Sequence, residues 1–415
     1  MKSPEPKFFR LSNGLKVIYL QTKNDPISAG HIFLPNGTWS EPPAQEGVTV
    51  LMLSAVFKGT EKRSARKLAE DTESLGAHIN ASASHDTSFI SCHSIAENFP
   101  KALGTMAEVL LTPSFPEEEI EKEKTALLAS IKAKKEQIST VAGEEINKRL
   151  FGKHPYSRPT SGTVKTVPNL NRRILLERHG KLVIPKNGIF SVASSHPLSE
   201  IKKTLEKLFG NSAWPNTPSH AIKAISETTA PKRCRVQLPS NFTQAFLMTG
   251  YPAAKARSED FLCLKLLSGI LGAGMSSRLF QSLRENLGLA YEVGAYYPTK
   301  KGGSSFVFYL GLEEKKIGEA KAEIQKEISK IKAEEISERE LTENKNFVKG
   351  SFLLDHQTNG QRSYYLGWWE MLGLGAGFDK KFVQEINKIT PAQLQKAARK
   401  YFSKDSVTVE VHAKK

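Results

Sequence analysis

The chain has 415 residues, of which 39% are hydrophobic, and it carries a formal net charge of +16 at pH 7. This length favours two domains of about 200 residues each over a single one. The lysines and arginines alternate with glutamates along predicted helices and form no arginine-rich arm, which argues against nucleic acid as the partner and favours an acidic protein or peptide.

Cysteine usage and the lack of long apolar segments bear on the compartment. The three cysteines, Cys92, Cys234 and Cys263, are far apart and form no Cys-x-x-Cys pair, so we expect isolated thiols and no disulfide framework. No apolar run reaches the roughly 18 residues of a membrane span. The first residues lack the apolar segment of a secretory signal, so we expect a cytoplasmic protein, or a periplasmic one if a leader has been removed.

Strands and helices are predicted in a mixed order along the chain. The strongest local signal is Asn13-Gly14, a two-residue turn flanked by apolar alternation. The first half predicts a hairpin at 8–21, a strand at 27–34, helices at 46–57 and 64–75, paired strands at 78–95, helices at 97–111 and 117–138, strands at 182–194 and a helix at 198–209. The second half opens with strands at 233–238 and 244–250, and it contains an aromatic-rich helix at 360–370, where we expect core packing, or alternatively a peptide-binding wall.

The two halves resemble each other in sequence. Residues 53–59 followed by 74–84 are similar to residues 267–274 followed by 286–296, at an offset of roughly 212–221 residues. The shared order of these similar segments indicates a duplication, and a repeat of this length means two tandem domains.

These observations predict a fold and its boundaries. We expect an α+β fold of two tandem homologous domains, 1–213 and 232–415, each an antiparallel-rich sheet covered by helices. Residues 214–231, rich in Pro, Ser and Thr, are the predicted linker.

Four sequence segments together point to a family. They are the helix at 47–56 with the Phe-Lys-Gly-Thr that follows it, and residues 75–84, 154–156 and 272–280. In combination they resemble the pitrilysin or insulinase family of inverted-zincin peptidases, and within it the processing peptidases, which implies the two-domain metallopeptidase fold.

The resemblance also identifies what this chain lacks. In the family, the first helix carries His-x-x-Glu-His, whose two histidines bind zinc and whose glutamate activates the metal-bound water. Here those positions hold Val50, Leu53 and Ser54, and the position of the third zinc ligand, a glutamate, holds Ser130. We therefore expect no metal in this chain. Glu123 matches a glutamate that supports the family's site, and on its charged helix we expect it to be solvated.

Three histidines lie near the degenerate motif. His78, His85 and His93 fall in the predicted paired strands. Regular alternation puts His78 and His85 on opposite faces and His85 and His93 on the same face. A polar strand face explains them without a metal.

Other family residues are retained. Arg284 and Tyr291 match the family's C-terminal Arg/Tyr motif, in which the Arg ends a helix, the Tyr enters a strand, and both point toward the zinc. A Tyr hydroxyl can donate to a developing oxyanion, and an Arg can hold a peptide carbonyl. Without the family resemblance, an Arg and a Tyr seven residues apart would be read as structural residues. Asn80 and Ala81 match the family's substrate-binding strand.

The loss of the zinc residues and the retention of Arg284 and Tyr291 suggest a function. In several family members one subunit carries zinc and the other supplies the Arg/Tyr side around an extended peptide. We therefore expect a non-catalytic subunit of a heterodimeric metallopeptidase, with zinc in its partner. The alternative is a peptidase-derived scaffold or peptide-binding protein without a role in proteolysis. An autonomous peptidase is disfavoured, because residues 47–60 contain no histidine.

Overall fold

The protein divides into two compact units in its computed structural model, which describes residues 5–23, 25–214, 225–226, 228 and 231–414. Unit 1 comprises the described residues of 1–131, 159–224 and 355–379, and unit 2 those of 132–158, 225–354 and 380–415. The units differ from the predicted contiguous ranges 1–213 and 232–415, because each includes a segment from the other half. Most of the predicted linker, 214–231, lies outside the described residues, so it stays a prediction.

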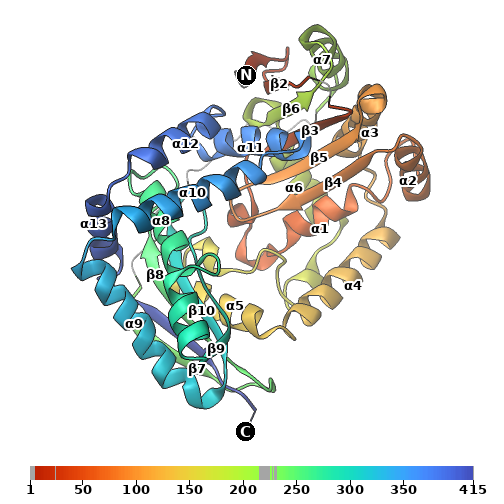
Figure 1. The fold of residues 1–415 in the computed structure, drawn as a ribbon. Coiled ribbons are helices and arrows are strands. Elements are labelled where there is room, and N and C mark those ends of the chain that lie inside the picture. Colours follow the sequence, from red (N-terminus) through yellow and green to blue (C-terminus); the bar gives the residue numbers. More distant parts are fainter. Residues whose placement is uncertain (1–4, 24, 215–224, 227, 229–230, 415) are drawn as a thin grey trace. The chain divides into compact units, whose positions relative to one another are not determined.

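Unit 1 is built on a six-stranded sheet with the strand order β1-β2-β6-β3-β5-β4. Strands β2 and β6 are parallel, and all other neighbours are antiparallel. Its elements are β1 (Lys7–Arg10), β2 (Lys16–Gln21), β3 (Ile27–Leu34), α1 (Val48–Ala55), α2 (Ala65–Ser74), β4 (His78–Ala83), β5 (Ser88–Ile95), α3 (Phe99–Leu111), α6 (Arg172–Leu182), β6 (Ile189–Ser194), α7 (Leu198–Leu205) and α11 (Asn359–Leu372) (Figure 1).

Unit 2 is built on a five-stranded sheet with the order β7-β11-β8-β10-β9. Its elements are α5 (Ile138–Phe151), β7 (Cys234–Leu238), β8 (Ala245–Ala253), α8 (Phe261–Gly272), the π-helix η8 (Phe280–Asn286), β9 (Ala290–Tyr296), β10 (Ser304–Leu312), α9 (Ile317–Ala333), α10 (Glu338–Leu354), α13 (Pro391–Tyr401) and β11 (Val407–Val411). Two further helices, α4 (Glu117–Lys134) and α12 (Phe378–Lys388), pass from the residues of one unit to those of the other.

The sheets repeat one topology, which agrees with the predicted duplication. Apart from the extra strand β1, the order β2-β6-β3-β5-β4 corresponds to β7-β11-β8-β10-β9, and in both sheets only the first two strands of that order are parallel. The predicted α+β fold of two similar sheet-and-helix domains is confirmed.

Each sheet is covered by a helix from the other half of the chain. Helix α11 packs on β3 and β6 of unit 1, and α5 packs on β8 and β11 of unit 2. The single helix predicted at 117–138 is wrong at its end, because α4 stops at Lys134 and α5 begins at Ile138. The helix predicted at 360–370 is confirmed, and its residues Leu366 and Met371 are buried against the sheet. The expectation of core packing therefore holds for this face of α11.

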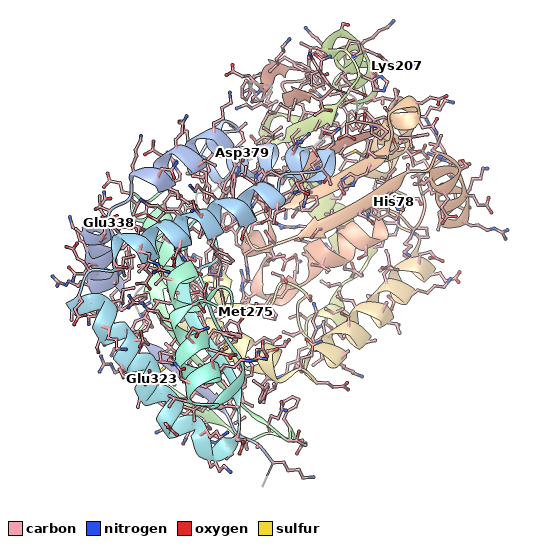
Figure 2. All side chains as sticks on the ribbon, viewed as in Figure 1. His78, Lys207, Met275, Glu323, Glu338 and Asp379 are labelled. Atoms are coloured by element: carbon pink, nitrogen blue, oxygen red, sulfur yellow. The ribbon has the colours of Figure 1, made fainter. Side chains whose placement is uncertain are left out.

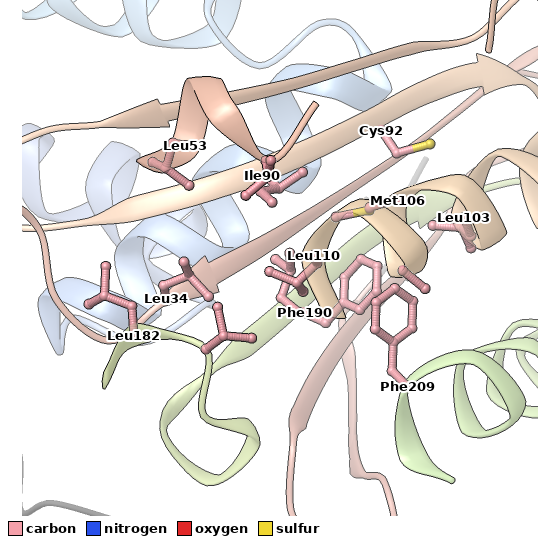
Figure 3. Packing of buried hydrophobic residues seen from close by; sticks show 14 of the residues in the cluster. Leu34, Leu53, Ile90, Cys92, Leu103, Met106, Leu110, Leu182, Phe190 and Phe209 are labelled. Atoms are coloured by element: carbon pink, nitrogen blue, oxygen red, sulfur yellow. The ribbon is translucent and has the colours of Figure 1, made fainter. Parts of the chain in front are cut away.

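The core of unit 1 lies between the sheet and helices α1 and α3. Leu53 of α1, Ile90 of β5 and Met106 of α3 belong to one buried cluster (Figure 3). The buried residues of this cluster are apolar and 0–6% exposed, so burial of hydrophobic surface holds α1 in place. No described helix combines the length and the apolar character needed to cross a membrane.

Candidate functional site

The helix that corresponds to the family's zinc helix, α1, is fixed at its start by buried polar groups. Gly47 has φ of 93° at the N-cap, and a Cβ there would lie 2.6 Å from the main-chain oxygen of Ser161, so only glycine fits. The Glu41 carboxylate accepts hydrogen bonds from the N–H groups of Gly47 and Thr49 at 2.9 and 2.8 Å. Burial raises the pKa of Glu41, against the effect of these hydrogen bonds and of the Arg178 charge.

The buried Arg178 completes this network. Its Nε donates to Thr49 Oγ1 at 3.0 Å, and Nη2 donates to the Gly37 carbonyl at 3.0 Å. The Glu41 carboxylate thus satisfies main-chain donors that a helix start otherwise leaves unpaired, and Arg178 ties the side chain of Thr49 to the loop at Gly37. The sequence therefore still positions α1 firmly, although its metal-binding residues are absent.

The degenerate positions do not fit zinc. Leu53, at the position of the catalytic glutamate, is 3% exposed and belongs to the hydrophobic core (Figure 3). Ser54 Oγ donates to the Val50 carbonyl at 3.2 Å, a local helix bond, and Ser130 is exposed on α4. These side chains offer neither imidazole nor carboxylate, so we assign no metal chemistry to them. Among the described residues, no group of three His, Cys, Asp or Glu is placed to hold a metal ion.

Glu123 is the one carboxylate of the family motif that remains. Its Oε1 lies 2.9 Å from Nζ of Lys58, the lysine of the Phe-Lys-Gly-Thr segment, and both side chains are partly buried. The expected solvated glutamate is therefore an ion-pair partner. This pairing joins α4 to the turn after α1.

The strand that resembles the family's substrate-binding strand, β4, forms one edge of the sheet of unit 1. Asn80 is exposed and Ala81 is half-buried, so the two alternate across the strand. An edge strand presents unpaired main-chain groups to which an extended peptide can add. His78 lies at the start of this strand (Figure 2).

The predicted faces of the three histidines are wrong. His85 lies in the turn between β4 and β5, which interrupts the alternation. His78 and His93 are instead direct cross-strand partners, and they lie on the same face. His31 of β3, which we did not single out from the sequence, joins them, with ring centroids 5.3 Å from His93. Because alternate residues of a strand share a face, the sequence could have placed His31 on one face with residues 29 and 33 of β3.

In unit 2, Arg284 and Tyr291 occupy the elements expected from the resemblance. Arg284 lies in η8 and Tyr291 at the start of the edge strand β9. The Arg284 guanidinium lies over the Phe280 ring, 5.1 Å from its centroid. The Tyr291 side chain is 43% exposed, and its ring packs on Gly311, where a Cβ would approach Tyr291 Cε2 to 2.6 Å. Burial, assisted by Glu292, raises the pKa of Tyr291, so its hydroxyl stays protonated and can donate.

The chain is similar to known proteins over nearly its whole length. Residues 16–164 match the family model described as Insulinase (Peptidase family M16), and residues 169–348 match that described as Peptidase M16 inactive domain. The "uncharacterized zinc protease YmxG" of Bacillus subtilis (strain 168) is 26% identical, over 96% of this chain and 96% of its own. The "non-peptidase homolog YmxG" of Helicobacter pylori (strain ATCC 700392 / 26695) is 25% identical, over 90% of this chain and 86% of its own.

A solved structure shares the fold. The crystal structure of a peptidase M16 inactive domain from Pseudomonas fluorescens has a TM-score of 0.91 at 22% identity, over 99% of this chain and 100% of that chain. The two family models together span most of the sequence, and their order matches the two halves of the duplication. The chain therefore belongs to the insulinase family of peptidases, family M16.

Proposed function

We propose that this protein is the non-catalytic subunit of a heteromeric zinc metallopeptidase. The observation that carries the proposal is a contrast between two sites. The resemblance matches α1 to the family's zinc helix, but the matched positions hold Val50, Leu53 and Ser54, and Leu53 lies in the core. Arg284 and Tyr291 are retained on η8 and β9, where Tyr291 is accessible.

In this proposal zinc belongs to a partner subunit that carries His-x-x-Glu-His. Tyr291 of this chain would donate a hydrogen bond from its hydroxyl to the oxyanion that develops on the substrate carbonyl, and Arg284 holds the start of β9 in place. The name of the Helicobacter pylori relative, a non-peptidase homolog, is in keeping with a chain that is inactive alone.

Substrate would be held as an extended peptide along the edge strand β4, beside Asn80 and Ala81. Main-chain hydrogen bonds supply affinity in this mode, so sequence preference is weak. The net charge of +16 supports an acidic peptide or an acidic partner surface.

The experiment combines this chain with an M16 subunit from the same genome that retains His-x-x-Glu-His. We expect neither subunit alone to cleave fluorescent casein efficiently and the mixture to do so. Tyr291→Phe should lower kcat by about 10²–10³-fold, the effect of removing one oxyanion donor. Tyr309→Phe, which removes a hydroxyl from the neighbouring strand β10, is the matched control and should leave kcat unchanged.

Substrate placement needs its own measurement. A photo-crosslinking residue at position 80 on the edge strand β4 should capture casein. The same residue at position 8, on the opposite edge strand β1, should not. Equal capture at both edges would contradict the peptide site.

The alternative function is a peptidase-derived scaffold or peptide-binding protein. It is favoured by one observation, that the Arg284 guanidinium bonds within its own chain, to the main-chain oxygen of Tyr291. If this alternative is correct, Tyr291→Phe supports full activity in the mixture, or no zinc-bearing subunit gains activity from this chain at all.

A further inference from the structure

A hollow in unit 1 is not explained by the proposed function. It lies where the start of α11 meets strands β3 and β5, and its volume is about 680 Å³. Volumes of about 300–1,000 Å³ are usual for sites that bind small molecules. Residues from 25–31 and 355–365, together with His93, line it, so segments from both halves of the chain form it.

The hydrogen bonds of His31 determine which of its nitrogens is free. Ser363 Oγ donates its single proton to the Gly360 carbonyl at 3.0 Å. With its proton on this carbonyl, Ser363 Oγ accepts from Nδ1–H of His31, 2.8 Å away, and in this arrangement Nε2 is left as an acceptor. Burial, with a smaller effect of His93, lowers the pKa of His31 to about 3, so the ring is neutral.

Asn359, which lines the hollow, carries a second unpartnered acceptor. Its side chain is 1% exposed, and its Nδ2 donates to the Ile27 carbonyl at 2.6 Å and to Thr22 Oγ1 at 2.9 Å. Because the Ile27 carbonyl can only accept, this orientation of the amide is fixed. Asn359 Oδ1 is buried and has no hydrogen-bond partner among the described residues. An unsatisfied buried acceptor costs about 1–3 kcal/mol, which a ligand can recover.

His93 adds a third unpartnered group. Its Nε2 is buried without a hydrogen-bond partner within the described part of the chain. The ring is fixed beneath α11, because a Cβ on Gly360 would lie 2.9 Å from its Cε1. Burial, with a smaller effect of His78, lowers the pKa of His93, so this ring is also neutral.

The charged groups of the hollow are carboxylates. Asp25 and Asp355 line it, and no lysine or arginine does so among the described residues. Asp25 Oδ1 accepts from the Ile27 N–H at 3.0 Å, and the Tyr365 hydroxyl bonds to Asp355, which leaves further lone pairs on both carboxylates. This acidic opening belongs to a protein whose net charge is +16.

The start of α11 is not an anion site. Thr358 and Gln361 form a capping box, in which each side chain accepts from the other residue's main-chain N–H, and the two nearby carboxylates repel anions. Tyr364 and Tyr365 also line the hollow, and the His356 ring stacks on Tyr365 with a centroid distance of 4.0 Å.

We propose that this hollow binds a small organic cation, an alkylammonium or guanidinium compound. Its donors would bond to Asn359 Oδ1 and His31 Nε2, while Asp25 and Asp355 balance its charge. This inference does not depend on a partner subunit or on proteolysis.

Calorimetric titration of the full chain tests the proposal, with agmatine and putrescine as probes and butanediol as the neutral analogue. We expect saturable binding of one cation per chain and none of butanediol. The double variant Asp25→Asn/Asp355→Asn should weaken binding about tenfold or more. Asp405→Asn, which removes a carboxylate from unit 2, should not.

A second measurement on the unmodified chain does not rely on the variants folding. The ring C–H resonances of His31 and His93 should move during the titration, whereas that of His412 in unit 2 should not. A third titration uses arginine with its amino and carboxyl groups blocked. This compound represents the guanidinium of a peptide side chain. If it binds more tightly than agmatine, the cation site stands and its ligand is a peptide side chain. No saturable binding, or binding by the double variant equal to that of the unmodified chain, overturns the proposal.

Discussion

Arg284 Nη1 donates to the main-chain oxygen of Tyr291 at 2.9 Å, so the two family residues are joined through the backbone. The Tyr291 hydroxyl takes no part in this bond. The positioning role of Arg284 and the chemical role proposed for Tyr291 are therefore separable by mutation, because each depends on a different atom of Tyr291.

Arg284→Ala should lower the stability of unit 2, whereas Tyr291→Phe should not. The alanine variant loses the hydrogen bond to the Tyr291 carbonyl and the contact with Phe280, which at this exposed site is worth about 0.5–1.5 kcal/mol. Tyr291→Phe keeps both contacts and should change stability by less than about 0.5 kcal/mol. Urea unfolding of the two variants measures the difference. Equal losses of stability would mean that the tyrosine hydroxyl is itself structural.

Leu53→Glu should destabilise the protein by at least about 3 kcal/mol, because it replaces a core leucine with a carboxylate that has no cationic partner there. A glutamate at this position would therefore also require changes in the apolar residues around it. Leu53→Met, which keeps the volume apolar, should cost less than about 1.5 kcal/mol. Thermal unfolding of both variants tests this, and a stable Leu53→Glu protein would show that the core tolerates a glutamate at this position.

The parts of the fold that could be predicted from the sequence are those with local signals. The hairpin at Asn13-Gly14 and the strand at 27–34 follow from turn chemistry and apolar alternation, and the structure has them as β1, β2 and β3. The exchange of α5 and α11 between the units could not be predicted. The apolar stripe of a helix indicates that it packs on a surface but does not identify which of two similar sheets it covers.

The candidate sites show the same division. The predicted loss of the zinc ligands rests on residue identity, and the elements that carry Arg284 and Tyr291 follow from a motif of fixed spacing. The hollow at His31 and Asn359 is different, because residues 328 positions apart in the sequence form it. The pairing of His78 with His93 was also missed, since the count along the strand did not place His85 in the turn.

Glu410→Gln should destabilise unit 2 by about 1–3 kcal/mol at pH 7, the worth of hydrogen bonds to a charged group. Glu410 of β11 is fully buried, and it accepts from Arg235 at 2.7 and 2.8 Å and from Lys321 at 2.9 Å. Burial alone would raise the pKa of Glu410, but these bonds and one from Gln237 outweigh it and lower the pKa to about 2.

The effect of Glu410 should depend on pH with a defined sign. Because its folded pKa lies below its unfolded value of about 4.5, its stabilisation is complete above pH 4.5 and is lost as the pH falls toward 2. The difference in unfolding midpoint between the unmodified protein and Glu410→Gln should therefore shrink through this window. Glu319→Gln, at an exposed site on α9, is the control and should show no such trend. A difference that stays constant down to pH 2 would contradict the assignment.

Gly367→Ala should destabilise the packing of α11 on the sheet of unit 1. A Cβ at Gly367 would lie within 2.5 Å of Phe33 Cδ2 and 2.7 Å of Ser191 Oγ, and the Phe33 ring is itself held by Phe89 and Tyr364. The helix must therefore shift, at a cost of about 1–3 kcal/mol, which outweighs the gain of up to about 1 kcal/mol in helix propensity.

Alanine substitutions at two other glycines serve as controls for the stability change of Gly367→Ala. Gly350 in α10 has nothing within 4 Å of an added Cβ, so Gly350→Ala should stabilise the protein by about 0.5–1 kcal/mol. Gly250 in β8 would meet Leu150 Cδ1 of α5 at 2.7 Å, the end of a flexible side chain, so Gly250→Ala should cost less than Gly367→Ala. Hydrogen exchange should then show faster exchange of the amides of α11 in Gly367→Ala alone. If the amides of α11 kept their protection in that variant, α11 would have to pack on Phe33 less tightly than these distances indicate.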